Sequence, residues 1–217
     1  MTGYTENPNV HFRTFGFVHI FGQKKLFFLD IVRKFGYHGG ALDEARRRGR
    51  RKTMKKVALI LGSDSDLPVA KKAAAVLKEL EIPFEIHVYS AHRTPEAARR
   101  FAAGAREAGF GVIIAFAGMA AHLAGALAAN TVLPVIGVPC AGPLLDGLDA
   151  LLSTVQMPTG IPVATVAVGG GANAALLAAQ MLSLADEALA AKLVARRQAE
   201  EEAVLAKDAG IAARLDG

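Results

Sequence analysis

Five short apolar runs, rich in valine and isoleucine, recur along the chain and constrain its fold more than any other feature. They cover residues 57–61, 84–89, 112–116, 135–138 and 163–168. The runs are too continuous for strands with one face in water, which is typical of a parallel sheet that is covered on both sides. Stretches of helical composition separate them. The sequence therefore predicts an α/β fold, a three-layer α/β/α sandwich around a five-stranded parallel sheet.

Helix signals lie in the segments between these runs. Asp66 can cap a helix in which Pro68 lies in the first turn, where its missing N–H costs little. The sequence Thr94-Pro95-Glu96 opens a second helix in the same way. The segment 120–130 is small and apolar all round, which predicts a buried helix. The helical stretches are expected over residues 70–80, 97–108, 120–130 and 172–195, the last as one helix or two.

Residues 1–53 differ from the rest of the chain in charge and composition. They hold 11 of the 25 Lys and Arg residues, only 4 of the 20 Asp and Glu residues, and seven of the 11 Phe residues. We expect a basic extension that is disordered, dispensable or the product of a mis-assigned start codon upstream of Met54. A transit peptide and a nucleic-acid-binding arm are the alternatives. The predicted organisation is an extension at 1–53, an α/β domain at 54–195 and a helical tail at 196–217.

The charge balance of the domain argues against two classes of partner. Residues 54–217 carry 14 Lys and Arg against 16 Asp and Glu, so the formal charge of +5 comes from the extension. This balance gives no support to nucleic-acid binding by the domain. Apolar stretches of the extension, such as 26–32, are far shorter than the ~20 residues of a membrane span. The extension has no long apolar segment near its start, so we expect it to be a poor secretory signal. We therefore predict neither nucleic acid nor membrane as a partner.

Cys140 is the single cysteine, which rules out a disulfide framework within the chain. No cluster of Cys and His residues has the spacing of a zinc site, so no metal is predicted. This pattern fits a reducing cytoplasm. No base can be assigned to Cys140, and we interpret it as a small packed residue rather than a nucleophile.

Polar and small residues follow the first run, where an open parallel sheet binds its ligands. The segment is Gly62-Ser63-Asp64-Ser65-Asp66. Serine hydroxyls and helix N-terminal amides can hold a phosphate, and an aspartate can accept hydrogen bonds from ribose hydroxyls. The same residues also cap helices for structural reasons alone, so both interpretations stay open.

The second run is followed by Ser90-Ala91-His92-Arg93-Thr94-Pro95. The guanidinium of Arg93 matches phosphate geometry through its fork of donors. The imidazole of His92 has an ordinary pKa that suits proton transfer near neutrality. A single histidine is more often a surface or structural group, but the His-Arg pair before a helix favours function.

The remaining runs are followed by glycine-containing turns. The third is followed by a segment that contains Gly118, Ala120, Ala121, His122 and Leu123, whose small residues let the backbone approach a ligand. Composition alone slightly favours His122 as a core histidine bonded to a carbonyl. Segments 139–142 and 169–173 are consistent with a closely approached rim or with ordinary turns, and segment 148–160 with a lid or a subunit contact. These features predict a site for a phosphorylated, sugar-like ligand.

Five segments, in order and spacing, resemble the class I N5-carboxyaminoimidazole ribonucleotide mutase family of purine synthesis. They are residues 62–66, 90–95, 120–123, 151–158 and 173–182, within a likeness that extends over residues 55–208. The resemblance implies a flavodoxin-like fold and a cytoplasmic homo-octamer with sites between subunits. It also implies an isomerase of IMP biosynthesis that acts on a small ribonucleotide, without a cofactor or a metal, and moves a carboxyl group from the exocyclic nitrogen to imidazole carbon 4.

The same resemblance implies roles for individual residues. His92 is the general acid/base at carbon 4, and His122 supports the loop that shapes the pocket. The ribose phosphate is held by Ser63, Asp66, Ser90 and Arg93, with Ser65 nearby. The substrate-binding set is completed by Ala91, Gly118, Ala120, Ala121 and Leu123.

Two residues beside His122 depart from the family pattern, which usually has glycine at Met119 and proline at Ala124. Two alternative functions are considered. A class II carboxylase would take aminoimidazole ribonucleotide and free CO2, but the sequence Gln156-Met157-Pro158 favours the mutase class. A non-catalytic flavodoxin-like module would bind a phosphorylated ligand or a partner protein. Flavin binding is disfavoured, because no Trp or Tyr follows the third run to stack on an isoalloxazine.

Overall fold

A five-stranded parallel sheet forms the centre of the computed structural model, which describes residues 54–143 and 145–211. The strands lie in the order β2-β1-β3-β4-β5, and every pair is parallel. This is the strand order of flavodoxin-like folds, so the predicted fold class is confirmed. The predictions for residues 1–53 lie outside the described residues. The strands are β1 Lys56–Leu61, β2 Phe84–Val88, β3 Phe110–Gly118, β4 Val135–Cys140 and β5 Ala164–Thr165.

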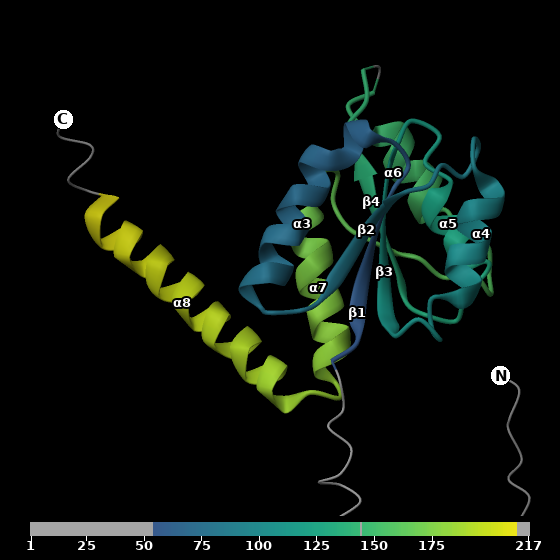
Figure 1. The fold of residues 1–217 in the computed structure, drawn as a ribbon. Coiled ribbons are helices and arrows are strands. Elements are labelled where there is room, and N and C mark those ends of the chain that lie inside the picture. Colours follow the sequence, from purple (N-terminus) through teal and green to yellow (C-terminus); the bar gives the residue numbers. More distant parts are fainter. Residues whose placement is uncertain (1–53, 144, 212–217) are drawn as a thin grey trace, which may run out of the picture. The chain divides into compact units, whose positions relative to one another are not determined.

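Helices cover both faces of the sheet (Figure 1). One face carries α3 (Leu67–Glu79) and α7 (Gly171–Ser183), which pack on each other. The other carries α4 (Pro95–Gly104), α5 (Leu123–Ala128) and α6 (Leu148–Val155). The last helix, α8 (Glu187–Ile211), follows α7 and extends away from the sheet.

Alternate residues of the central strand β1 point into two separate hydrophobic cores. Val57, Leu59 and Leu61 pack with α3 and α7, whereas Ala58 and Ile60 pack with α4 and α5. All five of these side chains are at most 1% exposed. Because successive strand residues face opposite sides, a run without polar residues needs a helical layer on each side. The three-layer prediction thus follows directly from the composition of β1.

Several elements are shorter than predicted. The fifth strand was expected over 163–168, but it pairs with β4 only at Ala164 and Thr165. It is an edge strand with one neighbour, and Pro139 of β4 has no N–H to donate to it. Likewise α4 ends at Gly104 rather than at residue 108, and α5 begins only at Leu123. The predicted burial of α5 is confirmed for Leu123 and Leu127.

The segment predicted as one helix or two forms two. A turn around Asp186 separates α7 from α8, where the Asp186 carboxylate accepts a hydrogen bond from the backbone N–H of Leu189. Helix α8 continues through residues 195 and 196, so no break in secondary structure marks the boundary expected there. Lys192 and Arg196 pair with Glu81 and Glu79 at the end of α3. Buried Leu189 and these ion pairs hold the first half of α8 against α3.

The sequence predicts no membrane as a partner, and the length and hydropathy of the described helices bear on this prediction. None of those in residues 54–143 and 145–211 combines the length and the hydropathy needed to cross a membrane.

Gly137 in the middle of β4 allows α6 to approach the sheet. A Cβ at this position would lie 2.3 Å from Thr154 Cγ2 and 3.1 Å from Val163 Cγ1. We expect Gly137→Ala to lower the free energy of unfolding by roughly 1–3 kcal/mol, because the buried helix must shift. Thermal and urea denaturation measure this change. The matched control is Gly104→Ala in α4, where an added Cβ meets nothing within 4 Å. This substitution should leave the free energy of unfolding unchanged or raise it by up to about 1 kcal/mol. Equal effects of the two variants would contradict this view of the packing.

Candidate active site

A cavity of about 680 Å³ lies at the carboxyl ends of β1, β2, β3 and β4. Four loops that are far apart in sequence form its walls, as expected for an open parallel sheet. The cavity is lined by Gly62, Ser63, Ser65, Asp66, Ser90, Ala91, His92, Arg93, Ala117, Gly118, Met119, Ala120, His122, Leu123, Ala141, Gly142 and Pro143. The cavity therefore brings together eleven of the twelve residues predicted for the site.

The first wall is a tight turn that begins at Ser63. Here the 3-10 helix η1 (Asp64–Asp66) is closed by a reciprocal pair of hydrogen bonds. The Ser65 N–H donates to Ser63 Oγ at 3.3 Å, and the Ser63 N–H donates to Asp66 Oδ2 at 3.0 Å. Asp66 occupies the N-cap position of α3, but its side chain makes no cap bond to that helix. The predicted position of Asp66 at the start of α3 is therefore confirmed, but its carboxylate turns back to the backbone N–H of Ser63 instead of bonding to that helix.

Asp66 is the charged residue of this wall that the fold buries, with 6% of its surface exposed. Burial raises the pKa of its carboxyl group above the ordinary value, although hydrogen bonds from the backbone of Ser63 and from the Cys140 thiol oppose the change. The same burial, with the nearby carboxylate, raises the pKa of Cys140 to about 12. A thiol with this pKa is protonated at neutral pH, which agrees with a packed rather than a nucleophilic cysteine.

The second wall is the turn after β2, which is held by its own side chains. Ser90 Oγ accepts a hydrogen bond from the backbone N–H of Arg93 at 3.1 Å, and Thr94 Oγ1 accepts one from the N–H of Ser90 at 2.9 Å. The guanidinium of Arg93 reaches across to the carbonyl of Gly62 at 3.4 Å. This contact places a permanent positive charge between the first two walls, beside the hydroxyls of Ser63 and Ser90. Such a group of donors suits a phosphate.

His92 and His122 meet across the cavity from two different loops. His92 Nε2 lies 2.9 Å from His122 Nδ1, and the two rings are nearly perpendicular, at 81°. Both side chains are exposed. The interpretation of His122 as a core histidine bonded to a carbonyl is wrong, because the turn after β3 directs it into the cavity toward His92. One ring donates to the other in this contact, so the pair can pass a proton between its two rings.

One predicted contact is absent from the cavity, and several lining residues were not predicted as contacts. Ala121 is 1% exposed and packs beneath the turn, so it supports the loop rather than lining the site. The unpredicted lining residues are Gly62, Ala117, Met119, Ala141, Gly142 and Pro143. Residues 141–143 follow β4, which lies beside β3 in the sheet. The signal that could have identified them is the strand order rather than any motif.

The fold and the cavity together define a flavodoxin-like α/β protein with a candidate small-molecule site at the carboxyl edge of its sheet. Within that class the comparison with protein families is specific. The family model described as AIR carboxylase matches residues 56–203. The chain belongs to the AIR carboxylase family.

Individual relatives agree with this membership. The N5-carboxyaminoimidazole ribonucleotide mutase of Mycobacterium tuberculosis is 58% identical over 154 residues, which are 71% of this chain and 88% of that protein. The mutase of Pyrococcus abyssi is 60% identical over 131 residues, which are 60% of this chain and 75% of that protein. The crystal structure of Treponema denticola PurE gives a TM-score of 0.63 at 29% identity and covers 71% of this chain and 96% of that one. The resemblance inferred from the five segments is confirmed.

The raised pKa of Asp66 predicts a pH-dependent cost in stability. A carboxyl group whose pKa is higher in the folded than in the unfolded state favours folding only while it is protonated, below the ordinary value of 3.8. This advantage is lost as the pH rises through the folded-state pKa. We expect Asp66→Asn, whose amide oxygen can still accept from Ser63, to melt about 2 °C or more above the parent at pH 7. Near pH 3.5 the two proteins should melt together. A variant that is less stable than the parent at pH 7 would contradict the argument.

Proposed function

We propose that this protein is an N5-carboxyaminoimidazole ribonucleotide mutase, which moves the carboxyl group from the exocyclic nitrogen to carbon 4 of the imidazole. The observation that carries the proposal is the His92–His122 pair at 2.9 Å in a cavity that is also lined by Ser63, Ser90 and Arg93. The relatives that are 58% and 60% identical are mutases by name, which supports the same activity.

The polar walls suit the ribose phosphate end of this substrate. Ser63 and Ser90 supply hydroxyls, and Arg93 supplies a charged donor between them. A phosphate has three terminal oxygens that accept hydrogen bonds, so several donors on adjacent loops can hold it. The Asp66 carboxylate would repel a phosphate but can accept from ribose hydroxyls. These residues orient the nucleotide so that its imidazole reaches the two histidines.

The histidine pair suits the proton movements of the reaction. When the bond between the exocyclic nitrogen and the carboxyl carbon breaks, its electron pair returns to the nitrogen, which takes one proton as CO2 forms. When carbon 4 then bonds to CO2, it must lose one proton for the ring to regain aromaticity. One proton is taken and one is released, so a single acid/base group can serve both steps. His92 performs this role, and His122 orients its ring.

The cavity must also keep CO2 between the two steps. CO2 that stays in the pocket beside the aminoimidazole ribonucleotide reacts at a far higher effective concentration than CO2 dissolved in water. The third and fourth walls, which are the turns after β3 and β4, are suited to this, because they line the cavity with small residues: Ala117, Gly118, Ala120 and Ala141. Catalysis by confinement and one histidine pair requires no redox chemistry.

The decisive experiment measures the conversion of N5-carboxyaminoimidazole ribonucleotide to the carbon-4 carboxylate. It uses the purified chain, without ATP or added bicarbonate. We expect the parent to turn over, and His92→Asn to lose about 10²–10⁴-fold in kcat, the usual contribution of general acid–base catalysis. The matched control is His87→Asn. His87 lies on β2 against Tyr89, outside the cavity, and its variant should retain activity.

Each outcome selects one function. An inactive parent that carboxylates aminoimidazole ribonucleotide when CO2 is supplied would be a class II carboxylase. A parent that acts on neither substrate would be a binding module. A fully active His92→Asn variant would remove the assigned acid/base from the mechanism.

We also propose that the protein is a homo-octamer, as the resemblance implies, and that the exposed face of α6 lies in a subunit interface. Leu148, Leu152 and Val155 form one stripe at helical spacing and are 52%, 50% and 46% exposed. A row of large aliphatic side chains in water is costly and is typical of an association surface. We further propose a cytoplasmic location, in agreement with the single buried thiol, and Met54 as the start of the catalytic domain.

The interface proposal predicts the effect of a charge on α6. We expect Leu152→Glu to shift the protein to smaller species, with the mass falling by about twofold or more, because a buried carboxylate opposes association. Sedimentation velocity measures the mass. Val132→Glu is the matched control, since Val132 is an isolated side chain that is 80% exposed. Retention of the full assembly by Leu152→Glu would remove α6 from the interface.

A further inference from the structure

Thr94 begins helix α4 but does not cap it with its side chain. A threonine at this position commonly accepts a hydrogen bond from a backbone N–H in the first turn of the helix. The Thr94 side chain makes no such bond. Its Oγ1 instead accepts a hydrogen bond from the N–H of Ser90 at 2.9 Å and donates one to the Ser90 carbonyl at 3.2 Å. The hydroxyl therefore serves the turn that precedes α4 rather than the helix itself.

The bonds between Thr94 and Ser90 close the turn that carries His92. The backbone N–H of Thr94 also donates to the Ser90 carbonyl, at 2.9 Å, so the two ends of the turn are joined through both the side chain and the backbone of Thr94. Residues 90–93 line the cavity, but Thr94 does not. Its hydroxyl can therefore influence the chemistry of the site only through the residues that it holds in place.

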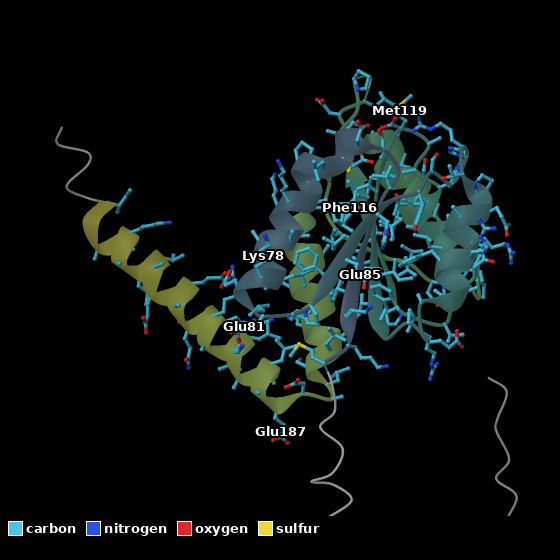
Figure 2. The ribbon with its side chains drawn as sticks, viewed as in Figure 1. Lys78, Glu81, Glu85, Phe116, Met119 and Glu187 are labelled. Atoms are coloured by element: carbon cyan, nitrogen blue, oxygen red, sulfur yellow. The ribbon has the colours of Figure 1, made fainter. Side chains whose placement is uncertain are left out.

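Packing alone does not hold this turn. Ala91 packs against a hydrophobic core, whereas the other three residues of segment 91–94 are exposed. Figure 2 shows the same edge of the sheet at β3, where Phe116 lies inside the molecule and Met119, in the turn that follows, lies at its end. An exposed residue keeps many conformations unless hydrogen bonds restrict its backbone. The bonds across the turn therefore set the path of residues 91–93.

Proton transfer requires an accurate position of His92. Its Nε2 lies 2.9 Å from His122 Nδ1, and a general acid or base must also lie within hydrogen-bond reach of the proton that it moves. A displacement of about 1 Å can lower a rate by roughly 10²-fold. The contact with His122 fixes one atom of the His92 ring. The bonds of Thr94 fix the backbone from which that ring extends.

We propose that Thr94 is a positioning residue of the mutase reaction, which holds the backbone of His92 so that its ring meets both His122 and carbon 4 of the substrate. The inference rests on the proposed mutase function. The same turn carries Ser90 and Arg93, so its closure also orders the donors for the phosphate. Loss of the Thr94 hydroxyl should thus lower kcat through His92 and raise KM through the phosphate donors.

The test removes the hydroxyl of Thr94 and nearly preserves the shape of its side chain. Thr94→Val is assayed in the purified full chain with N5-carboxyaminoimidazole ribonucleotide. We expect kcat to fall about tenfold or more, because the His92 ring is misplaced, and KM to rise about threefold or more. Thr94→Ser keeps the hydroxyl and should stay within about twofold of the parent in both constants.

The matched control is Thr131→Val. Thr131 Oγ1 accepts a hydrogen bond from the backbone N–H of Leu133 at 3.2 Å, and Thr131 lies outside the cavity. The control therefore also removes a hydroxyl that bonds to the backbone of a turn, but at a distance from the site. Its kcat and KM should equal those of the parent.

A second background separates positioning from a general loss of structure. In His92→Asn the group that Thr94 positions for proton transfer is already absent. Adding Thr94→Val to this variant should change kcat by less than about twofold, because two residues that act as a unit are not additive, while KM should still rise. A substitution that only lowered the folded fraction would lower kcat equally in both backgrounds.

Melting temperatures establish that each variant is folded, and Thr94→Ala replaces Thr94→Val if the latter does not fold. The proposal is overturned by a parent-like kcat in the variant without the hydroxyl, by an equal loss of kcat in both backgrounds, or by an equal loss in Thr94→Ser. A parent that does not convert the substrate would refute the mutase function instead. A crystal structure of Thr94→Val then tests the role in the turn by itself, because an unchanged contact between His92 and His122 would overturn that role, and a lost contact would support it.

Discussion

The central strands of this protein have no face that can be exposed to water. Val57, Leu59 and Leu61 fill one core and Ala58 and Ile60 fill the other, so a helical layer must cover each side of the sheet. In these central strands, backbone groups that lack a partner in the sheet and hydrophilic side chains are then left to the strand ends. Because the strands are parallel, all four carboxyl ends that border the cavity lie on one edge. The burial of the strands thus determines where a site can form.

The candidate site divides its tasks among the loops at that edge. The turns after β1 and β2 are rigid, since Ser63, Asp66, Ser90 and Thr94 bond to their own backbone. Their side chains supply donors for an anion. The residues with which the turns after β3 and β4 line the cavity are apolar apart from His122, and they include Met119, whose φ is positive. A polar half that holds the nucleotide and an apolar half that confines CO2 match the two needs of a carboxyl transfer within one molecule.

Two of the costs that the fold accepts lie at this site, and a third lies at a proposed interface. Asp66 is buried and its pKa is raised, and Met119 is held at a positive φ. Both residues line the cavity. The aliphatic stripe of α6 is a cost of a different kind, because a second subunit can remove it. Stability is reduced where ligand binding or assembly can offset the loss.

Much of the local structure was predictable from the sequence, because the composition of a strand or helix is read directly from its residues. The five apolar runs gave the parallel sheet, and the short motifs after them gave the segments of the site. Local patterns could not reveal the pairing of His92 with His122, which are separated by 30 positions and meet only through the arrangement of β2 and β3 around β1. They could not show that Asp66 turns toward Ser63, or that residues 141–143 line the cavity. The sequence by itself determined which elements form and which residues lie at their ends. The tertiary structure decided which of those residues meet, because strand order and loop path set the distances between side chains.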